Sequence, residues 1–62
     1  MVNMTRQQRI ALRKIHQRMQ QTSTDAISYR ALRRSVQPGP GCVMVQFAGM
    51  WLGIEPDGYT HS

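Results

Sequence analysis

Residues 42–54 read Cys42-Val43-Met44-Val45-Gln46-Phe47-Ala48-Gly49-Met50-Trp51-Leu52-Gly53-Ile54, and they carry the clearest structural pattern in this chain. They are rich in β-branched and aromatic residues, which favours strands on both sides of Ala48-Gly49. With those two residues as a tight loop, all the facing pairs are apolar: Phe47 with Met50, Val45 with Leu52, and Val43 with Ile54. Because strand side chains alternate, these residues share one face, and a slip of one residue would misplace a whole strand. The pattern predicts an antiparallel hairpin; a type I turn with Gly49 in a bulge is an equal alternative for its loop.

Residues on both sides of this hairpin predict turns. The segment 37–41, Gln37-Pro38-Gly39-Pro40-Gly41, ends any helix because proline lacks an amide donor and glycine allows a sharp change of direction. Residues 56–62 are predicted to form a turn and a polar tail, since Pro56 and Gly58 take the second and fourth turn positions after Glu55.

The N-terminal part predicts one long basic helix. Thr5 and Gln8 have the spacing of a capping box, which starts the helix at residue 6. Residues 6 to about 21 are mostly of types that favour helix. One apolar stripe recurs at helical spacing: Ala11, Leu12, Ile15 and Met19.

A second, shorter helix is predicted after a polar loop, with Ser28 or Asp25 as its N-cap. The side chains expected to face the first helix are Ile27, Ala31, Leu32 and Val36. Those expected to be more exposed are Tyr29, Arg30, Arg33 and Arg34.

These elements together predict an α+β fold in one small domain, residues 1–62. A basic helical part (1–36) and the 37–41 break precede a C-terminal antiparallel hairpin (42–55), which packs on the helices. Two strands alone are weakly stable, so either the helices cover the apolar hairpin face or another copy of the chain extends the sheet. The predicted core of the hairpin consists of Val43, Val45, Phe47, Met50, Leu52 and Ile54.

Size and composition argue against several protein classes. A chain of 62 residues buries only about 60% of its unfolded surface and is marginal alone. The single cysteine, Cys42, forms no intrachain disulfide and fits a reducing compartment. With His16 and His61 it makes no zinc-binding spacing, so we expect no metal and no cofactor. No apolar run approaches the roughly 20 residues of a membrane span, and we expect a cytoplasmic protein.

The charge of the chain is sharply divided. All eight basic residues lie in residues 1–34 with one acid, Asp25, a net of +7, while the rest holds Glu55 and Asp57, a net of −2, giving +5 in total. The basic residues are Arg6, Arg9, Arg13, Lys14, Arg18, Arg30, Arg33 and Arg34. This asymmetry favours a polyanion partner, since arginine suits forked contacts with phosphate or carboxylate. The alternative is a solvated helix face, although such faces normally mix both signs.

Groupings typical of enzymes are missing from the sequence. Cys42 would act as a nucleophile only beside a base such as His16 or His61, and a small residue starting a strand is the simpler interpretation. Glu55 and Asp57 are interpreted as turn residues. We therefore expect no enzymatic activity.

Two segments, Tyr29 to Pro38 and Gly49 to Ser62, resemble small uncharacterised open reading frames of bacteriophages. The resemblance implies a short phage-encoded accessory or virion protein, located in the host cytoplasm or the virion. It transfers no functional residues.

Two functions follow as hypotheses. In the first, the helical basic residues bind phosphates of DNA or RNA without enzymatic action. In the second, the chain is a protein-interaction module in which the same arginines meet an acidic protein surface. Trp51 and Tyr59 would then anchor the partner, or, as the alternative, cover the core.

Overall fold

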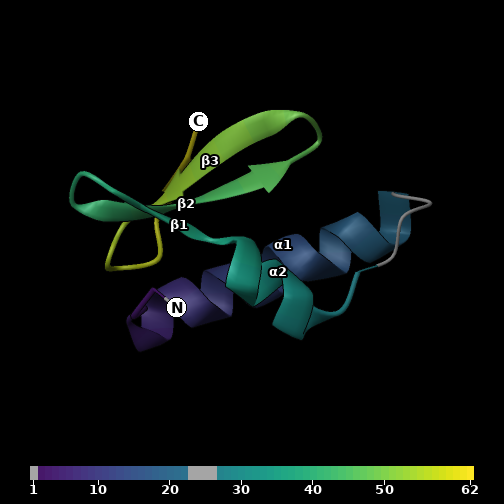
Figure 1. Cartoon of the computed structure of the whole chain (residues 1–62), viewed down its shortest axis with the longest axis horizontal. Helices are drawn as coiled ribbons and strands as arrows, with labels where there is room; N and C mark the ends of the chain where they lie inside the picture. Colours follow the sequence, from purple (N-terminus) through teal and green to yellow (C-terminus); the bar gives the residue numbers. More distant parts are fainter. Residues whose placement is uncertain (1, 23–26) are drawn as a thin grey trace.

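The structure, a computed structural model, describes residues 2–22 and 27–62 of the chain. Within these residues two helices precede four strands: α1 (Arg6–Thr22), α2 (Tyr29–Ser35), β1 (Gln37–Gly39), β2 (Cys42–Phe47), β3 (Met50–Ile54) and β4 (Thr60–His61). The strands form one antiparallel sheet in the order β1-β2-β3-β4. Both helices lie on the same side of this sheet (Figure 1). The predicted α+β class is confirmed, and the predicted hairpin forms the centre of a larger sheet.

The cap of α1 also fixes the helix to the sheet. The Gln8 N–H donates to Thr5 Oγ1 over 3.1 Å and the Thr5 N–H donates to Gln8 Oε1 over 2.8 Å, which confirms the capping box. The Thr5 hydroxyl donates to the Pro56 carbonyl at 2.6 Å, and Gln8 Nε2 donates to the Ile54 carbonyl at 3.0 Å. The start of α1 is therefore held against the end of β3 by the same two side chains that begin the helix.

The second helix has a different inward face from the predicted one. Ser28 caps it, accepting the Ala31 N–H at 3.1 Å, while the alternative cap, Asp25, lies outside the described residues. Leu32 and Val36 are buried as predicted. The expectation was wrong for Ile27 and Ala31, which are exposed, and for Tyr29 and Arg33, which are half-buried. The reason is helical phase: the helix begins at Tyr29, so positions 29, 32, 33 and 36 form the inward stripe.

The hairpin has the predicted register. Phe47 pairs with Met50, Val45 with Leu52, and Val43 with Ile54. Ala48 and Gly49 have φ values of 53° and 78°, and the two positive values match a two-residue type I′ loop rather than the bulged alternative.

Two short edge strands were not predicted. Residues 37–39 pair with β2 instead of forming only a break, and Pro38 is tolerated there because an edge strand leaves one side of its backbone unpaired. The predicted turn after Glu55 is confirmed, since the Gly58 N–H donates to the Glu55 carbonyl at 2.8 Å. Thr60 and His61, which were predicted to belong to a polar tail, instead pair with β3 as the edge strand β4.

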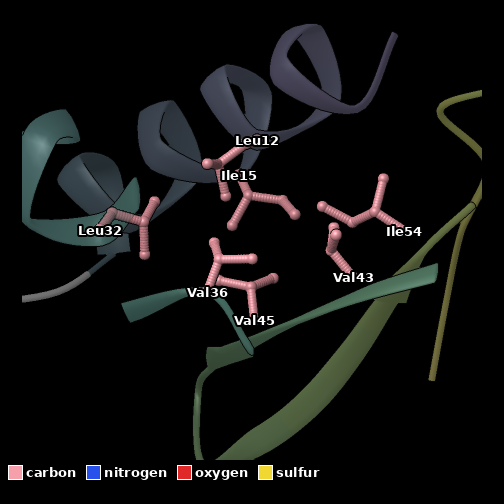
Figure 2. Close-up of a cluster of buried hydrophobic side chains, with 7 residues drawn as sticks. All are labelled: Leu12, Ile15, Leu32, Val36, Val43, Val45 and Ile54. Atoms are coloured by element: carbon pink, nitrogen blue, oxygen red, sulfur yellow. The ribbon is translucent and has the colours of Figure 1, made fainter. Parts of the chain in front are cut away.

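The core lies between the helices and the inner face of the sheet (Figure 2). Its buried side chains are Leu12, Ile15, Leu32, Val36, Val43, Val45 and Ile54. Phe47 and Leu52 pack against this cluster and are half-buried, as are Ala11 and Met19. Met50 was wrongly placed in the core: it sits at the hairpin tip and is 49% exposed. The side of the sheet opposite the helices carries a row of facing residues from all strands: Gln37, Met44, Gly53 and His61.

Candidate nucleic-acid interface

The basic side chains all belong to the helical layer. α1 carries Arg6, Arg9, Arg13, Lys14 and Arg18, and Arg30, Arg33 and Arg34 lie in α2. Because both helices cover one face of the sheet, the positive charge is confined to that side of the molecule (Figure 1). The predicted division of the chain into a basic helical part and a remainder without basic residues is thus also a division in space.

Six of these side chains are exposed: Arg6, Arg13, Lys14, Arg18, Arg30 and Arg34. Arg9 and Arg33 are half-buried. Arg9 Nη1 lies 3.5 Å from the Met4 carbonyl, at the long limit for a hydrogen bond. Arg33 Nε is buried with no hydrogen-bond partner among the described residues. The exposed six are therefore the side chains best placed to contact a partner.

Contacts between α1 and α2 fix the position of one exposed basic side chain, Arg13. The guanidinium of Arg13 lies over the Tyr29 ring, 4.3 Å from its centroid, an arrangement that stabilises cation and ring by about 0.5–1 kcal/mol at exposed sites. The His16 ring meets Tyr29 edge-on at 5.9 Å between centroids, and His16 Nε2 lies 2.7 Å from the Ile27 carbonyl. These contacts tie the start of α2 to the middle of α1. They place Arg13 beside Tyr29, the first residue of α2.

The acids described by the structure do not neutralise this surface. Within residues 2–22 and 27–62 the one ion pair joins Glu55 to His61, with 2.7 Å between Oε2 and Nε2. Neither Glu55 nor Asp57 pairs with any arginine or with Lys14. Asp25, the acid of the basic segment, lies outside the described residues.

Glu55 and Asp57 flank a turn whose backbone lies against the start of α1. The turn that they flank reaches Thr5 through the Pro56 carbonyl, and the Gly58 backbone approaches the Gln7 carbonyl so closely that a Cβ there would lie 3.0 Å from its oxygen. The N-terminus of a helix is its positive end, and α1 has no acid in its own first turn. The β3–β4 turn therefore meets this helix end through its backbone, while the Glu55 carboxylate contacts His61 and Asp57 accepts the Tyr59 N–H.

The glutamines of α1 divide into two groups. Gln7, Gln17 and Gln20 are exposed beside the arginines and are candidates for contacts to phosphates or base edges. Gln8 is not such a candidate: it is 4% exposed, and both ends of its amide are engaged by Thr5 and Ile54. Its role is structural.

Trp51 and Tyr59 do not cover the core. Trp51 pairs with Gln46 on the sheet face opposite the helices and is 48% exposed. Tyr59 is 65% exposed and stacks on His61, with 5.9 Å between ring centroids and 28° between planes. His61 in turn lies over Gly53, where a Cβ would be 2.8 Å from its ring. Trp51 and Tyr59 therefore lie on the side of the molecule opposite the basic surface.

The groups considered for catalysis lie apart. Cys42 Sγ is 3.7 Å from Met44 Sδ, whereas His16 contacts Ile27 and His61 contacts Glu55. Among the residues that the structure describes, no three His, Cys, Asp or Glu side chains come together as metal ligands.

Comparison with protein-family models, with curated proteins and with solved structures finds no match for this chain. In the described part of the chain, neither helix has the length and apolar character needed to cross a membrane.

Proposed function

We propose that this chain is a small non-enzymatic protein that binds nucleic acid through contacts between its helical basic side chains and phosphates. The observation that carries the proposal is the exposure of six basic side chains on one layer, none of them paired with Glu55 or Asp57. A surface with such an excess of one sign concentrates the electrostatic field and attracts polyanions.

The length of α1 suits a phosphate backbone. From Arg6 to Arg18 the helix rises about 18 Å at 1.5 Å per residue. Duplex DNA carries one charge per about 1.7 Å of its axis, so this length faces about ten phosphates. Arg30 and Arg34, on the neighbouring helix, extend the basic surface sideways. Contacts of this kind position a protein on nucleic acid and carry no sequence preference.

The test is a titration of labelled mixed-sequence DNA, and of RNA of the same sequence, at about 50 mM salt, followed by fluorescence anisotropy. The double variant Arg30→Gln/Arg34→Gln should weaken binding about tenfold to both, because it removes two phosphate contacts. Gln46→Ala, an uncharged change on the opposite side of the sheet, is the matched control and should bind as the parent chain does. Absence of binding at this salt concentration to either nucleic acid would refute the proposal.

A specific observation supports the alternative, a phage accessory or virion module that docks an acidic protein surface. Trp51 and Tyr59 are exposed on the side away from the helices, where they are available as anchors. Absorbance at 260 and 280 nm of the material purified at low salt, together with its eluted mass, separates the two. A high 260 to 280 nm ratio supports nucleic acid, while a second polypeptide with a protein-like ratio supports the alternative.

A further inference from the structure

A groove separates α1 from the end of the β2–β3 hairpin and the β3–β4 turn, with a volume of about 440 Å³. The groove is lined on the helix side by Gln7, Ile10, Lys14 and Arg18 of α1. On the sheet side it is lined by Asp57 and Gly58 of the turn and by Thr60 at the start of β4. Lys14 and Arg18 belong to the basic set of both hypotheses drawn from the sequence, but neither hypothesis placed an apolar groove beside them.

The floor of the groove is apolar. Phe47 and Leu52 pack against the core and are half-buried, and the buried Ile15 of α1 also lines the groove. On the rim, Ile10 is 39% exposed although it belongs to a polar helix face. Exposed apolar area in a concave site is the feature that binding partners cover.

The two ends of the groove carry opposite charge. Lys14 and Arg18 are four residues apart on α1, so they stand on the same side of the helix with about 5–6 Å between their Cβ atoms. Asp57 lies nearer the other end of the groove, on the turn that contacts Gln7, where one of its carboxylate oxygens accepts the Tyr59 N–H at 3.0 Å. The groove is therefore polarised along its length, with two cations toward one end and one carboxylate toward the other.

We propose that this groove docks a segment of an acidic protein, with one large apolar side chain on the floor and carboxylates against Lys14 and Arg18. The apolar floor matches an anchor side chain, and Asp57 matches backbone amides or a base toward the other end of the segment. A nucleic-acid strand fits less well, because its phosphates would meet the Asp57 carboxylate. A second copy of this chain fits less well too, because each copy carries a net charge of +5 and would bring further arginines to the groove.

Peptide docking in this groove does not require that the chain binds nucleic acid. The two surfaces share Lys14 and Arg18. The probes are labelled twelve-residue peptides with a central Leu or Phe flanked by Asp and Glu, titrated into the ¹⁵N-labelled chain. A charge-reversed peptide, a peptide with Ser in place of the anchor, decanoate and mixed-sequence DNA serve as separate arms. Docking is expected to shift the amide signals of Ile10, Lys14, Leu52 and Gly58.

Two matched pairs of variants locate the site. Lys14→Glu/Arg18→Glu should weaken peptide binding at least about tenfold, because rim charges in the groove change sign. Arg30→Glu/Arg34→Glu, on α2, should leave it within about twofold while weakening DNA binding as strongly as the first pair does. Ile10→Ser should weaken peptide binding several-fold, whereas Ile27→Ser, at 38% exposure outside the groove, should not.

Several results would overturn the inference. The inference fails if the peptide with Ser as anchor binds as tightly as the peptide with Leu or Phe, or if the two charge-reversed double variants lose peptide affinity equally. It also fails if the amide signals that shift belong only to the outer face of the sheet, or if decanoate binds and the acidic peptide does not. Peptide docking without DNA binding would support the groove and refute the proposed function. DNA binding without peptide docking would support the proposed function and refute the groove as a docking site.

Discussion

The double use of Gln8, as a helix cap and as a link to the sheet, predicts a large loss of stability from one small change. Gln8→Ala removes the acceptor of the Thr5 N–H and the donor to the buried Ile54 carbonyl. Leaving a buried carbonyl without a partner costs about 1–3 kcal/mol, and losing a cap interaction costs about 1 kcal/mol. The Gln8 side chain loses conformational entropy on folding and alanine does not, which offsets up to about 1.5 kcal/mol of this loss of stability. We therefore expect the free energy of unfolding to fall by about 2 kcal/mol.

The assay is urea and thermal unfolding, followed by circular dichroism and by the fluorescence of Trp51, the only tryptophan of the chain. In a domain this small, about 2 kcal/mol corresponds to a midpoint lowered by about 8–16 °C. Gln17→Ala is the matched control, since Gln17 lies on the same helix and is exposed; its effect should stay below about 0.5 kcal/mol. Equal stabilities of the two variants would refute the role assigned to Gln8.

Three further changes test the fold and its strained or crowded positions. Ala48→Asn should raise the free energy of unfolding by about 1 kcal/mol in urea titrations, because Ala48 has φ of 53° and asparagine tolerates that region; an unchanged midpoint would contradict the type I′ loop. Gly53→Ala should turn the exposed His61 ring away from the sheet and separate it from Glu55, while the free energy of unfolding changes by less than about 1 kcal/mol, because the ring can rotate and alanine loses less backbone entropy than glycine; unchanged chemical shifts of the His61 ring would contradict this contact. Tyr29→Phe should raise stability by about 1 kcal/mol in thermal unfolding, because the Tyr29 hydroxyl is buried without a partner among the described residues, and a loss would show that the hydroxyl is engaged.

The centre of the fold was predictable because its signals are local. Alternating apolar residues around Ala48-Gly49 allow one register that keeps them on a single face, and the structure has that register. The Thr5–Gln8 pair likewise predicts the start of α1 from side chains three residues apart. The edge strands carry no such signal. Residues 37–39 and 60–61 pair only because the hairpin already offers them backbone partners, which a proline-rich break and a short polar tail do not reveal.

The candidate interface was predicted in composition but not in arrangement. The identity of the basic residues can be read from the sequence. Their separation from Glu55 and Asp57 follows because the basic residues lie on the two helices and the two acids follow β3. Arg13 over Tyr29 and the groove beside Lys14 depend on contacts between elements distant in sequence. One sequence signal for the groove did exist, because Ile10 is an apolar residue outside the buried stripe of α1.

The salt dependence of nucleic-acid binding tests the central proposal most directly. Each neutralised phosphate of duplex DNA contributes about −0.9 to the slope of log K against log salt concentration. If all six exposed basic side chains contact phosphates, the slope is about −5 and affinity falls about a thousandfold between 50 and 200 mM salt. A slope near zero, or affinity unchanged across that range, would contradict binding through the helical arginines.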